Sequence, residues 1–223
     1  MSPRPKLGHI RRPQIIEAAI ATIYERGFSE TRIMDIADNA GTSAPSILYY
    51  FESKEKLLEQ ALTHSDEAFY AKLRDEIEAL DTANAQLVHI VERCAAPPDP
   101  HGDWTLWMEM WLQVRHRPHL RGTYERLERS GQQPLIAEVI RRGQRDGEFS
   151  AEVDAGDVAT MLSALIDGLG VQVTLRHPDV TAERMTRLCL EAAALTLEFE
   201  PVRLTKGHET GSAPRIRAGA GKR

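Results

Sequence analysis

The sequence predicts an all-α fold: an N-terminal three-helix helix-turn-helix domain followed by a larger helical domain, about nine helices in total. Three observations predict this fold. Strand patterns, in which polar and apolar residues alternate, are almost absent from the 223 residues. Apolar residues instead recur three or four positions apart, as on one face of a helix. Gly and Pro residues fall between these periodic segments, where they end helices.

The first helix is predicted to end at Gly27. The second begins at Thr31, which we expect to act as its cap, and ends at Gly41, where glycine suits a left-handed exit. The third is short and runs from Ser43 to about Tyr50. The fourth is long and is predicted from residue 53 to residue 80. Five more helices follow, with Pro and Gly stops that predict the spans 85–96, 103–116, 120–146, 155–176 and 181–199.

The composition is that of an ordinary folded chain. Charged residues make up 27% and hydrophobic residues 42%, which argues against global disorder. No apolar run is long enough for a membrane span, and residues 1–12 lack the apolar core of a secretory signal. The two cysteines, Cys94 and Cys189, have no CxxC spacing, so we expect no disulfide framework. The sequence predicts a cytoplasmic protein with no cofactor, no metal and no membrane partner.

The net charge of −5 hides two basic ends. Residues 1–12 contain four Arg or Lys and no acid, while residues 201–223 contain six basic residues and one acidic residue. We expect 1–12 to form a basic flexible arm. We expect 201–223 to form a disordered basic tail, because it is rich in Gly, Ala and Pro. Each end is either a solvated extension or a non-specific contact to nucleic-acid phosphates.

The second and third predicted helices are short and joined by a tight turn that contains Gly41. This arrangement is typical of a helix-turn-helix, in which the second helix lies in a DNA major groove. Hydroxyl and small side chains remain on the outer face, where hydroxyls bind phosphates and small apolar groups contact thymine methyls. Tyr49 and Tyr50 favour a DNA contact on this face. The alternative is that these two rings form a packing patch.

The segment from Ile15 to Leu58 resembles the DNA-binding domain of TetR-type transcriptional regulators. Two positions depart from the family pattern: Thr42 stands where Val is common, and Leu48 where many members have Tyr. The second departure resembles the BetI-like branch. The positions that match the pattern are Thr31, Ile36, Ala37, Ala40, Gly41, Ser43, Tyr50, Phe51, Ser53, Lys54 and Leu57.

The resemblance implies a DNA-binding domain over residues 13–54. It places phosphate contacts at the start of the second helix and at Tyr50 and Lys54, and base contacts on the third helix. Few of these residues are bidentate base readers, so we expect apolar and shape readout to matter. The implied DNA-binding residues are Thr31, Arg32, Thr42, Ser43, Ala44, Pro45, Ser46, Tyr49, Tyr50 and Lys54.

Residues 55–200 resemble the helical ligand-binding and dimerisation domain of the same family. The similar pieces are W-T-L-W-M-E-M-W, R-R-G-Q-R-D-G-E-F and A-L-I-D-G-L-G-V-Q. In that fold the last two long helices pair with their copies in a homodimer. The apolar stripes of 155–176 and 181–199 support this, although one chain of this length can also bury such stripes itself. A homodimer would prefer a near-palindromic DNA site.

All three tryptophans, Trp104, Trp107 and Trp111, fall on one face of the helix predicted at 103–116. Such a stripe either belongs to the core or lines a pocket for an apolar or cationic ligand. The sequence leaves both open. The residues predicted to line or contact such a pocket are Phe69, His89, Arg93, Trp107, Met108, Trp111, Ile140, Met161, Leu165 and Gln172.

The resemblance implies a DNA-binding transcriptional regulator, in common family habit a repressor, that binds operator DNA as a homodimer. It also implies release by a small-molecule effector that moves the fourth helix. Choline is suggested as effector by the BetI-like resemblance alone, and the orientation of the acidic residues Glu109 and Asp167 stays open. The alternative is a helical ligand- or protein-binding module without sequence-specific DNA binding, which Leu48 favours. The sequence contains no nucleophile elbow or phosphate loop of an enzyme.

Overall fold

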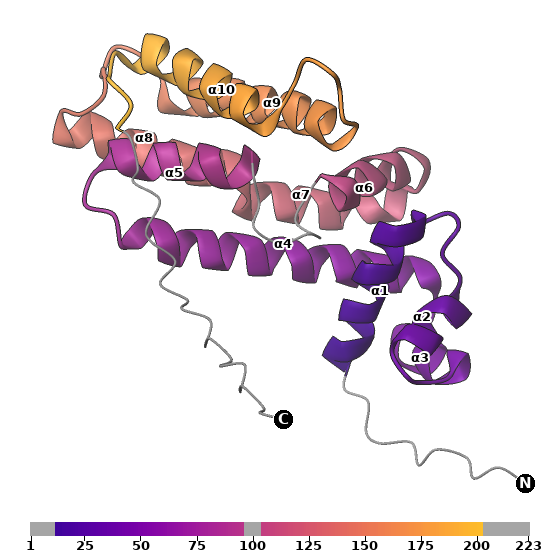
Figure 1. Cartoon of the computed structure of the whole chain (residues 1–223). Coiled ribbons are helices and arrows are strands. Elements are labelled where there is room, and N and C mark those ends of the chain that lie inside the picture. The colour runs from indigo at the N-terminus through magenta and orange to yellow at the C-terminus, as the bar shows by residue number, and fades with distance from the viewer. Residues whose placement is uncertain (1–11, 96–103, 203–223) are drawn as a thin grey trace, which may run out of the picture.

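The computed structural model describes residues 12–95 and 104–202, and every regular element in these ranges is a helix (Figure 1). This confirms the predicted all-α fold. The predicted arm, apart from Arg12, and the predicted tail, apart from residues 201–202, lie outside the described residues. The helices are α1 (Arg12–Arg26), α2 (Ile33–Asn39), α3 (Ala44–Phe51), α4 (Lys54–Glu78), α5 (Ala83–Ala95), α6 (Thr105–His116), the 3₁₀ turn η1 (Pro118–Leu120), α7 (Arg121–Ser130), α8 (Gln132–Asp146), α9 (Ala155–Thr174) and α10 (Ala182–Leu197).

Helices α1, α2 and α3 pack together at one end of the molecule, against the first turns of α4 (Figure 1). Ile15, Ile36, Ile47 and Phe51 are almost completely buried in their shared core. Burial of each such side chain stabilises the fold by roughly 1.5–3 kcal/mol relative to exposure. This small core fixes α3 rigidly against the other two helices.

The turn between α2 and α3 has the predicted helix-turn-helix form. Gly41 adopts a φ of 65°, and the N–H of Thr42 donates to the carbonyl of Ala37 at 2.8 Å. The Oγ of Ser43 then caps α3 by accepting from the N–H of Ser46 at 3.3 Å. Glycine reaches this left-handed conformation without strain, so the chain turns sharply between the two helices.

The predicted cap of α2 is wrong by one residue. Arg32 occupies the cap position, and its backbone N–H donates to the side chain of Asp35 at 2.9 Å. Thr31 instead turns inward, with an exposed fraction of 1%, and its Oγ1 donates to the carbonyl of Gly27 at 2.7 Å. Thr31 therefore closes the turn between α1 and α2 rather than capping the next helix.

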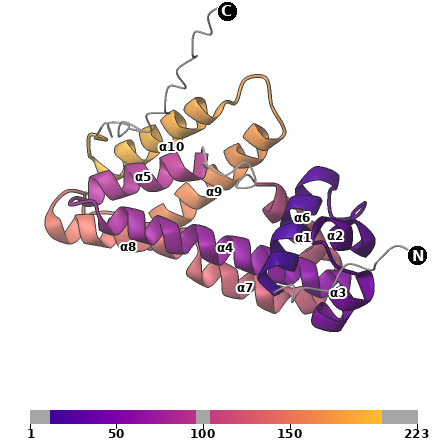
Figure 2. The ribbon, with the colours of Figure 1, turned by 60° about the horizontal axis from the view of Figure 1, so that its bottom comes forward.

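The long helix α4 runs through three hydrophobic clusters in sequence. Leu57 belongs to the N-terminal core, and Leu58 and Leu62 pack in a middle cluster with α6 and α7. Leu73 and Ile77 reach the largest core, which α5, α8, α9 and α10 complete. Figure 1 shows α5 and α8 between α4 and the pair α9–α10, and Figure 2 shows α1, α2 and α3 together at one end of α4. Helix α4 thus connects the N-terminal domain to the larger one.

The helix predicted over 120–146 is divided in the structure. The 3₁₀ turn η1 precedes α7, and Gly131 separates α7 from α8. A Cβ at Gly131 would lie 3.0 Å from the Leu127 carbonyl and 3.5 Å from the ring of Tyr70. The break coincides with Gly131, whose φ of −88° and ψ of −139° are not helical, and with Pro134, which lacks the N–H that an unbroken helix needs at that position.

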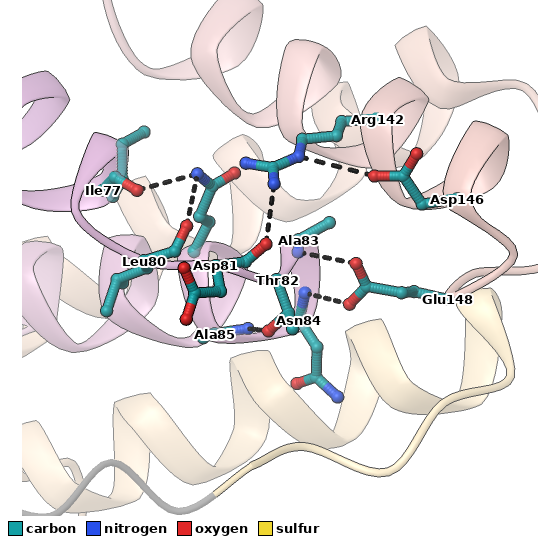
Figure 3. A network of polar contacts seen from close by, with 11 residues as sticks. Ile77, Leu80, Asp81, Thr82, Ala83, Asn84, Ala85, Arg142, Asp146 and Glu148 are labelled. Atoms are coloured by element: carbon teal, nitrogen blue, oxygen red, sulfur yellow. Dashed lines mark hydrogen bonds and ion pairs between the residues drawn. The ribbon is translucent and has the colours of Figure 1, made fainter.

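The start of α5 is fixed by a network of polar contacts (Figure 3). The carboxylate of Glu148 accepts hydrogen bonds from the backbone N–H groups of Ala83 and Asn84, both at 2.9 Å. Arg142 donates to the carbonyl of Asp81 at 2.7 Å. An anion at a helix N-terminus satisfies free N–H groups and complements the helix dipole. We call these five residues the α5 joint.

The α5 joint depends on Gly143, which lies on α8. A Cβ at Gly143 would overlap the ring of Phe149, which is almost fully buried. Phe149 in turn packs edge-on against Phe199, with ring centroids 4.8 Å apart. The packing of this domain therefore depends on the segment R-R-G-Q-R-D-G-E-F, which contains both Gly143 and Phe149.

No helix in the described part of the chain is long and apolar enough to cross a membrane. Cys94 and Cys189 are both free and buried. Burial raises the pKa of each thiol to about 12. Among the described residues, no group of three His, Cys, Asp or Glu side chains is placed to hold a metal ion.

Candidate functional site

The outer face of α3 exposes large side chains. Tyr49 has an exposed fraction of 84%, Tyr50 of 47% and Leu48 of 44%. The two tyrosine rings touch edge to face, with centroids 5.5 Å apart. Three large exposed side chains on an eight-residue helix are typical of a surface that binds a partner.

The N-terminus of α3 lies on the same outer face. Ser43 and Pro45 are exposed, and Ala44 and Ser46 are half-buried. The two serine hydroxyls lie 2.9 Å apart. Thr42 in the preceding turn is half-buried, and Arg32 at the start of α2 is exposed. Most of the predicted DNA-binding residues therefore belong to one helix and the turns beside it.

Two residues that were predicted to contact phosphate form contacts within the protein instead. The Thr31 side chain is buried and already donates to Gly27, so its hydroxyl is no surface group. The ammonium of Lys54 donates to the carbonyl of Ser29 at 3.3 Å and lies 4.5 Å from the centre of the Phe28 ring. Burial lowers the pKa of Lys54. Only the tertiary packing of the α1–α2 turn reveals these two positions.

Two adjoining cavities of about 60 and 30 Å³ lie between α4, α6 and the α7–α8 break. We call them together the aromatic chamber. Both are lined by Tyr70, Trp104, Trp107 and Gln132. Trp111 extends the second cavity, and its ring lies 6.4 Å from that of Trp104. The tryptophan stripe is therefore half-buried and lines a pocket.

The first cavity contains a buried acid. Asp66 has an exposed fraction of 5%, and its Oδ1 has no hydrogen-bond partner within the described residues. Burial, followed by the charge of Glu128, raises the pKa of Asp66 to about 7. Phe69, Tyr70 and Trp107 line the same cavity. A carboxyl group among aromatic rings is suited to bind a cation.

The second cavity contains another acid. The Oδ1 of Asp167 accepts from Nε2 of Gln132 at 3.2 Å. Burial raises the pKa of Asp167 to about 6, although this hydrogen bond opposes the shift. The hydroxyl of Ser163, which lines this cavity, is buried without a partner in the described part of the chain. The chamber therefore contains polar groups that the described residues leave unsatisfied.

The structure brings four of the predicted pocket residues, Phe69, Arg93, Trp107 and Trp111, to the chamber. The other six lie elsewhere, because the sequence does not show which side of each helix faces α6. Ile140 is in the large core, Met161 is exposed, Leu165 packs at the core edge, Met108 is half-buried on α6, His89 pairs with Glu76, and Gln172 donates to Gly168.

Sequence reasoning missed Tyr24, Asp66, Tyr70 and Gln132 at the chamber. One of them, Asp66, could have been found from the sequence pattern. Asp66 stands four residues after Leu62 and four before Tyr70, which is within the apolar stripe of α4. A charged residue in the buried stripe of a helix calls for a partner, and none is present for its Oδ1 among the described residues.

The geometry defines a class: a DNA-binding regulator, with an exposed recognition helix joined to a helical domain that contains a ligand chamber. Residues 15–61 match the family described as bacterial regulatory proteins, tetR family. Residues 83–198 match the family described as BetI-type transcriptional repressor, C-terminal. The chain belongs to the TetR family of transcriptional regulators and has a BetI-type C-terminal domain.

Individual relatives agree with this assignment. A regulator named BetI 2 from Chromohalobacter salexigens is 34% identical over 77% of this chain and 82% of its own length. A transcriptional regulator from Saccharomonospora viridis, solved in complex with choline, is 34% identical with a TM-score of 0.74, over 81% of this chain and 93% of that one. A TetR-family regulator from a Rhodococcus species is 26% identical with a TM-score of 0.72, over 85% and 100%.

Proposed function

We propose that this protein is a cytoplasmic repressor whose effector is a small organic cation of the quaternary ammonium type. The buried carboxyl group of Asp66 carries this proposal, because its Oδ1 has no partner among residues 12–95 and 104–202 and aromatic rings line the same cavity. A quaternary ammonium group has no N–H to donate. It is bound by the faces of aromatic rings and by a nearby negative charge. The choline complex of the relative from S. viridis supports the same ligand class.

The ionisation of Asp66 makes effector binding depend on pH. In the empty chamber burial favours the neutral acid, and the pKa is about 7. A cation binds the ionised form better, so its affinity rises with pH and levels off above about 7. Below that pH the affinity falls by up to about tenfold per pH unit, because binding must release a proton.

Choline titration with tryptophan fluorescence tests this proposal directly, because all three tryptophans of the chain line the chamber. We expect choline to bind more than tenfold tighter than 3,3-dimethylbutan-1-ol, which has the same shape without the charge. We expect Asp66→Asn to abolish that preference. A matched exposed variant, Asp157→Asn, controls for charge alone. Equal affinity for the charged and neutral ligands would contradict the proposal.

The proposed DNA contact is the outer face of α3 with the start of α2. We assign contacts to Arg32, Ser43, Pro45, Tyr49 and Tyr50, which are exposed, and to the half-buried Thr42, Ala44 and Ser46 beside them. Lys54 would reach phosphate only by leaving Phe28. Footprinting on the DNA that flanks its own gene tests this surface. Tyr49→Ala should weaken operator binding at least tenfold without changing the melting temperature.

The proposed homodimer forms through α9 and α10. Their outer faces expose Leu195 at 83% and Met161 at 42%, and Leu188 and Ala192 are half-buried beside them. Burial of these side chains against a second copy would hold the two α3 helices at the spacing of a near-palindromic site. Sedimentation should give a dimer at micromolar concentration. Leu195→Glu should give a folded monomer, and a dimeric variant would exclude this face.

A further inference from the structure

The turn between α1 and α2 is held by side chains from the larger domain. The backbone N–H of Phe28 donates to Oε1 of Glu109, in the middle of α6, at 3.1 Å. The centre of the Phe28 ring lies 4.5 Å from the ammonium of Lys54 and 5.8 Å from the guanidinium of Arg117. Arg117 is itself fixed by Glu55 at 2.9 Å. We call this set of contacts the α6 latch.

The position of Glu109 is unusual for a carboxylate. Its Oε2 is buried and has no hydrogen-bond partner within the described residues. The Phe28 N–H donates to the other oxygen, Oε1, and the charge of Lys54 lies near enough to interact with the carboxylate. A bond from a backbone N–H to a carboxylate is stronger than one between neutral groups. The bond joins α6 to the α1–α2 turn, so a shift of α6 away from that turn would break it.

Helix α6 carries both the latch and the chamber. Leu106 and Trp107 line the first cavity, with Trp104 at the helix cap, while Glu109 points to the α1–α2 turn. Tyr24 of α1 lines the same cavity. Ile23 and Phe28 pack with Leu106 and Met110 in one apolar cluster. A ligand that separates Trp107 from α4 therefore displaces the helix that holds the DNA-binding domain.

We propose that Glu109 is the residue that couples the chamber to the DNA-binding domain. Its bond to Phe28 fixes that domain in the orientation that binds the operator, and effector binding breaks the bond by moving α6. This inference rests on the proposed function for the identity of the effector. The chamber and the DNA-binding domain are then connected through α6 as well as through α4.

Loss of the latch should change the affinities for operator and for choline in opposite directions, which distinguishes coupling from a purely structural role. If the latch stabilises the operator-binding state, its loss shifts the protein toward the effector-binding state. Glu109→Ala should then weaken operator binding and tighten choline binding, because the apparent affinity of each ligand follows the population of the state that it binds. We expect a factor of about five or more, the lower end of typical allosteric coupling. A variant that is merely less stable would not bind choline more tightly.

Three variants of the full-length protein test the proposal. Glu109→Ala removes the acceptor, and Glu109→Gln keeps an acceptor oxygen without the charge and should behave closer to the unchanged protein. Glu125→Ala removes an exposed carboxylate on α7 that pairs with Arg121 and controls for charge. The readouts are operator binding, choline binding and amide hydrogen exchange of the segment 27–31. If Glu109→Ala does not fold, exchange of the Phe28 amide in the unchanged protein with and without choline carries the test.

We expect faster exchange of the Phe28 amide in Glu109→Ala, by about tenfold or more, and in the unchanged protein when choline is added. Unchanged exchange and operator affinity in both Glu109 variants would overturn the latch. The failure of choline to bind any variant would contradict the proposed effector instead. Exchange and operator binding of Glu109→Ala without ligand would still decide the latch.

Discussion

The α5 joint and the aromatic chamber are two polar clusters of the same domain, and they differ in how far their groups are satisfied. In the joint, both oxygens of Glu148 accept backbone hydrogen bonds, and Arg142 donates to a carbonyl (Figure 3). In the chamber, Oδ1 of Asp66 and the hydroxyl of Ser163 are buried without partners among the described residues. Buried polar groups stabilise a fold only when they are paired. The joint therefore stabilises the domain, whereas the unpaired polar groups of the chamber are available to a ligand.

The largest effect is expected at Gly143, which lies next to the joint in the sequence. Gly143→Ala should destabilise the protein by about 3 kcal/mol, because the new Cβ overlaps the buried ring of Phe149 and overpacking distorts a core. Chemical denaturation measures the change. Gly122→Ala on α7, where a Cβ meets nothing within 4 Å, is the matched control and should be neutral or slightly stabilising. Equal stability of the two variants would show that the core at Phe149 yields easily.

Loss of the Glu148 carboxylate should come next. Glu148→Ala leaves the N–H groups of Ala83 and Asn84 without their acceptor and should cost about 2 kcal/mol. Glu148→Gln keeps one acceptor oxygen and should cost about half as much. Thermal unfolding of both variants measures the difference. Full stability of Glu148→Ala would mean that solvent replaces the carboxylate and that the joint is unimportant.

Removal of the Asp66 charge should have the opposite sign. The pKa of Asp66 rises from its ordinary 3.8 to about 7 on folding, so the unfolded chain binds fewer protons between these values and stability falls as pH rises. Asp66→Asn should therefore stabilise the empty protein by roughly 1–3 kcal/mol at pH 8 and by little at pH 4. Denaturation across this range checks the sign. Destabilisation at pH 8 would make Asp66 part of a satisfied core.

The smallest effect is expected at Ser163. Ser163→Ala removes a buried hydroxyl that has no partner within the described residues, so the stability of the empty protein should change by less than about 1 kcal/mol. The sharper measurement is the affinity for choline, whose own hydroxyl group is a candidate partner. A loss above 2 kcal/mol of stability without ligand would place Ser163 with the joint rather than the chamber.

The sequence predicted the exposed face of α3 better than it predicted the lining of the chamber. The outer face of α3 follows from local signals, namely the Ser43 cap, the Gly41 turn and a helix too short to bury both of its faces. The chamber depends on how α4, α6 and α8 are rotated about their axes relative to one another. Six of ten predicted pocket residues therefore lie elsewhere, while Asp66 and Gln132 were missed.

The sequence by itself determined the helices, most of their ends and the helix-turn-helix, because apolar periodicity, caps and glycine turns act between residues near in the chain. Tertiary structure alone decided the inward turn of Thr31 and the contacts of Lys54 with Phe28. It also decided the bond from Phe28 to Glu109, 81 positions apart. Such contacts depend on how distant helices pack, and that packing is a property of the whole core.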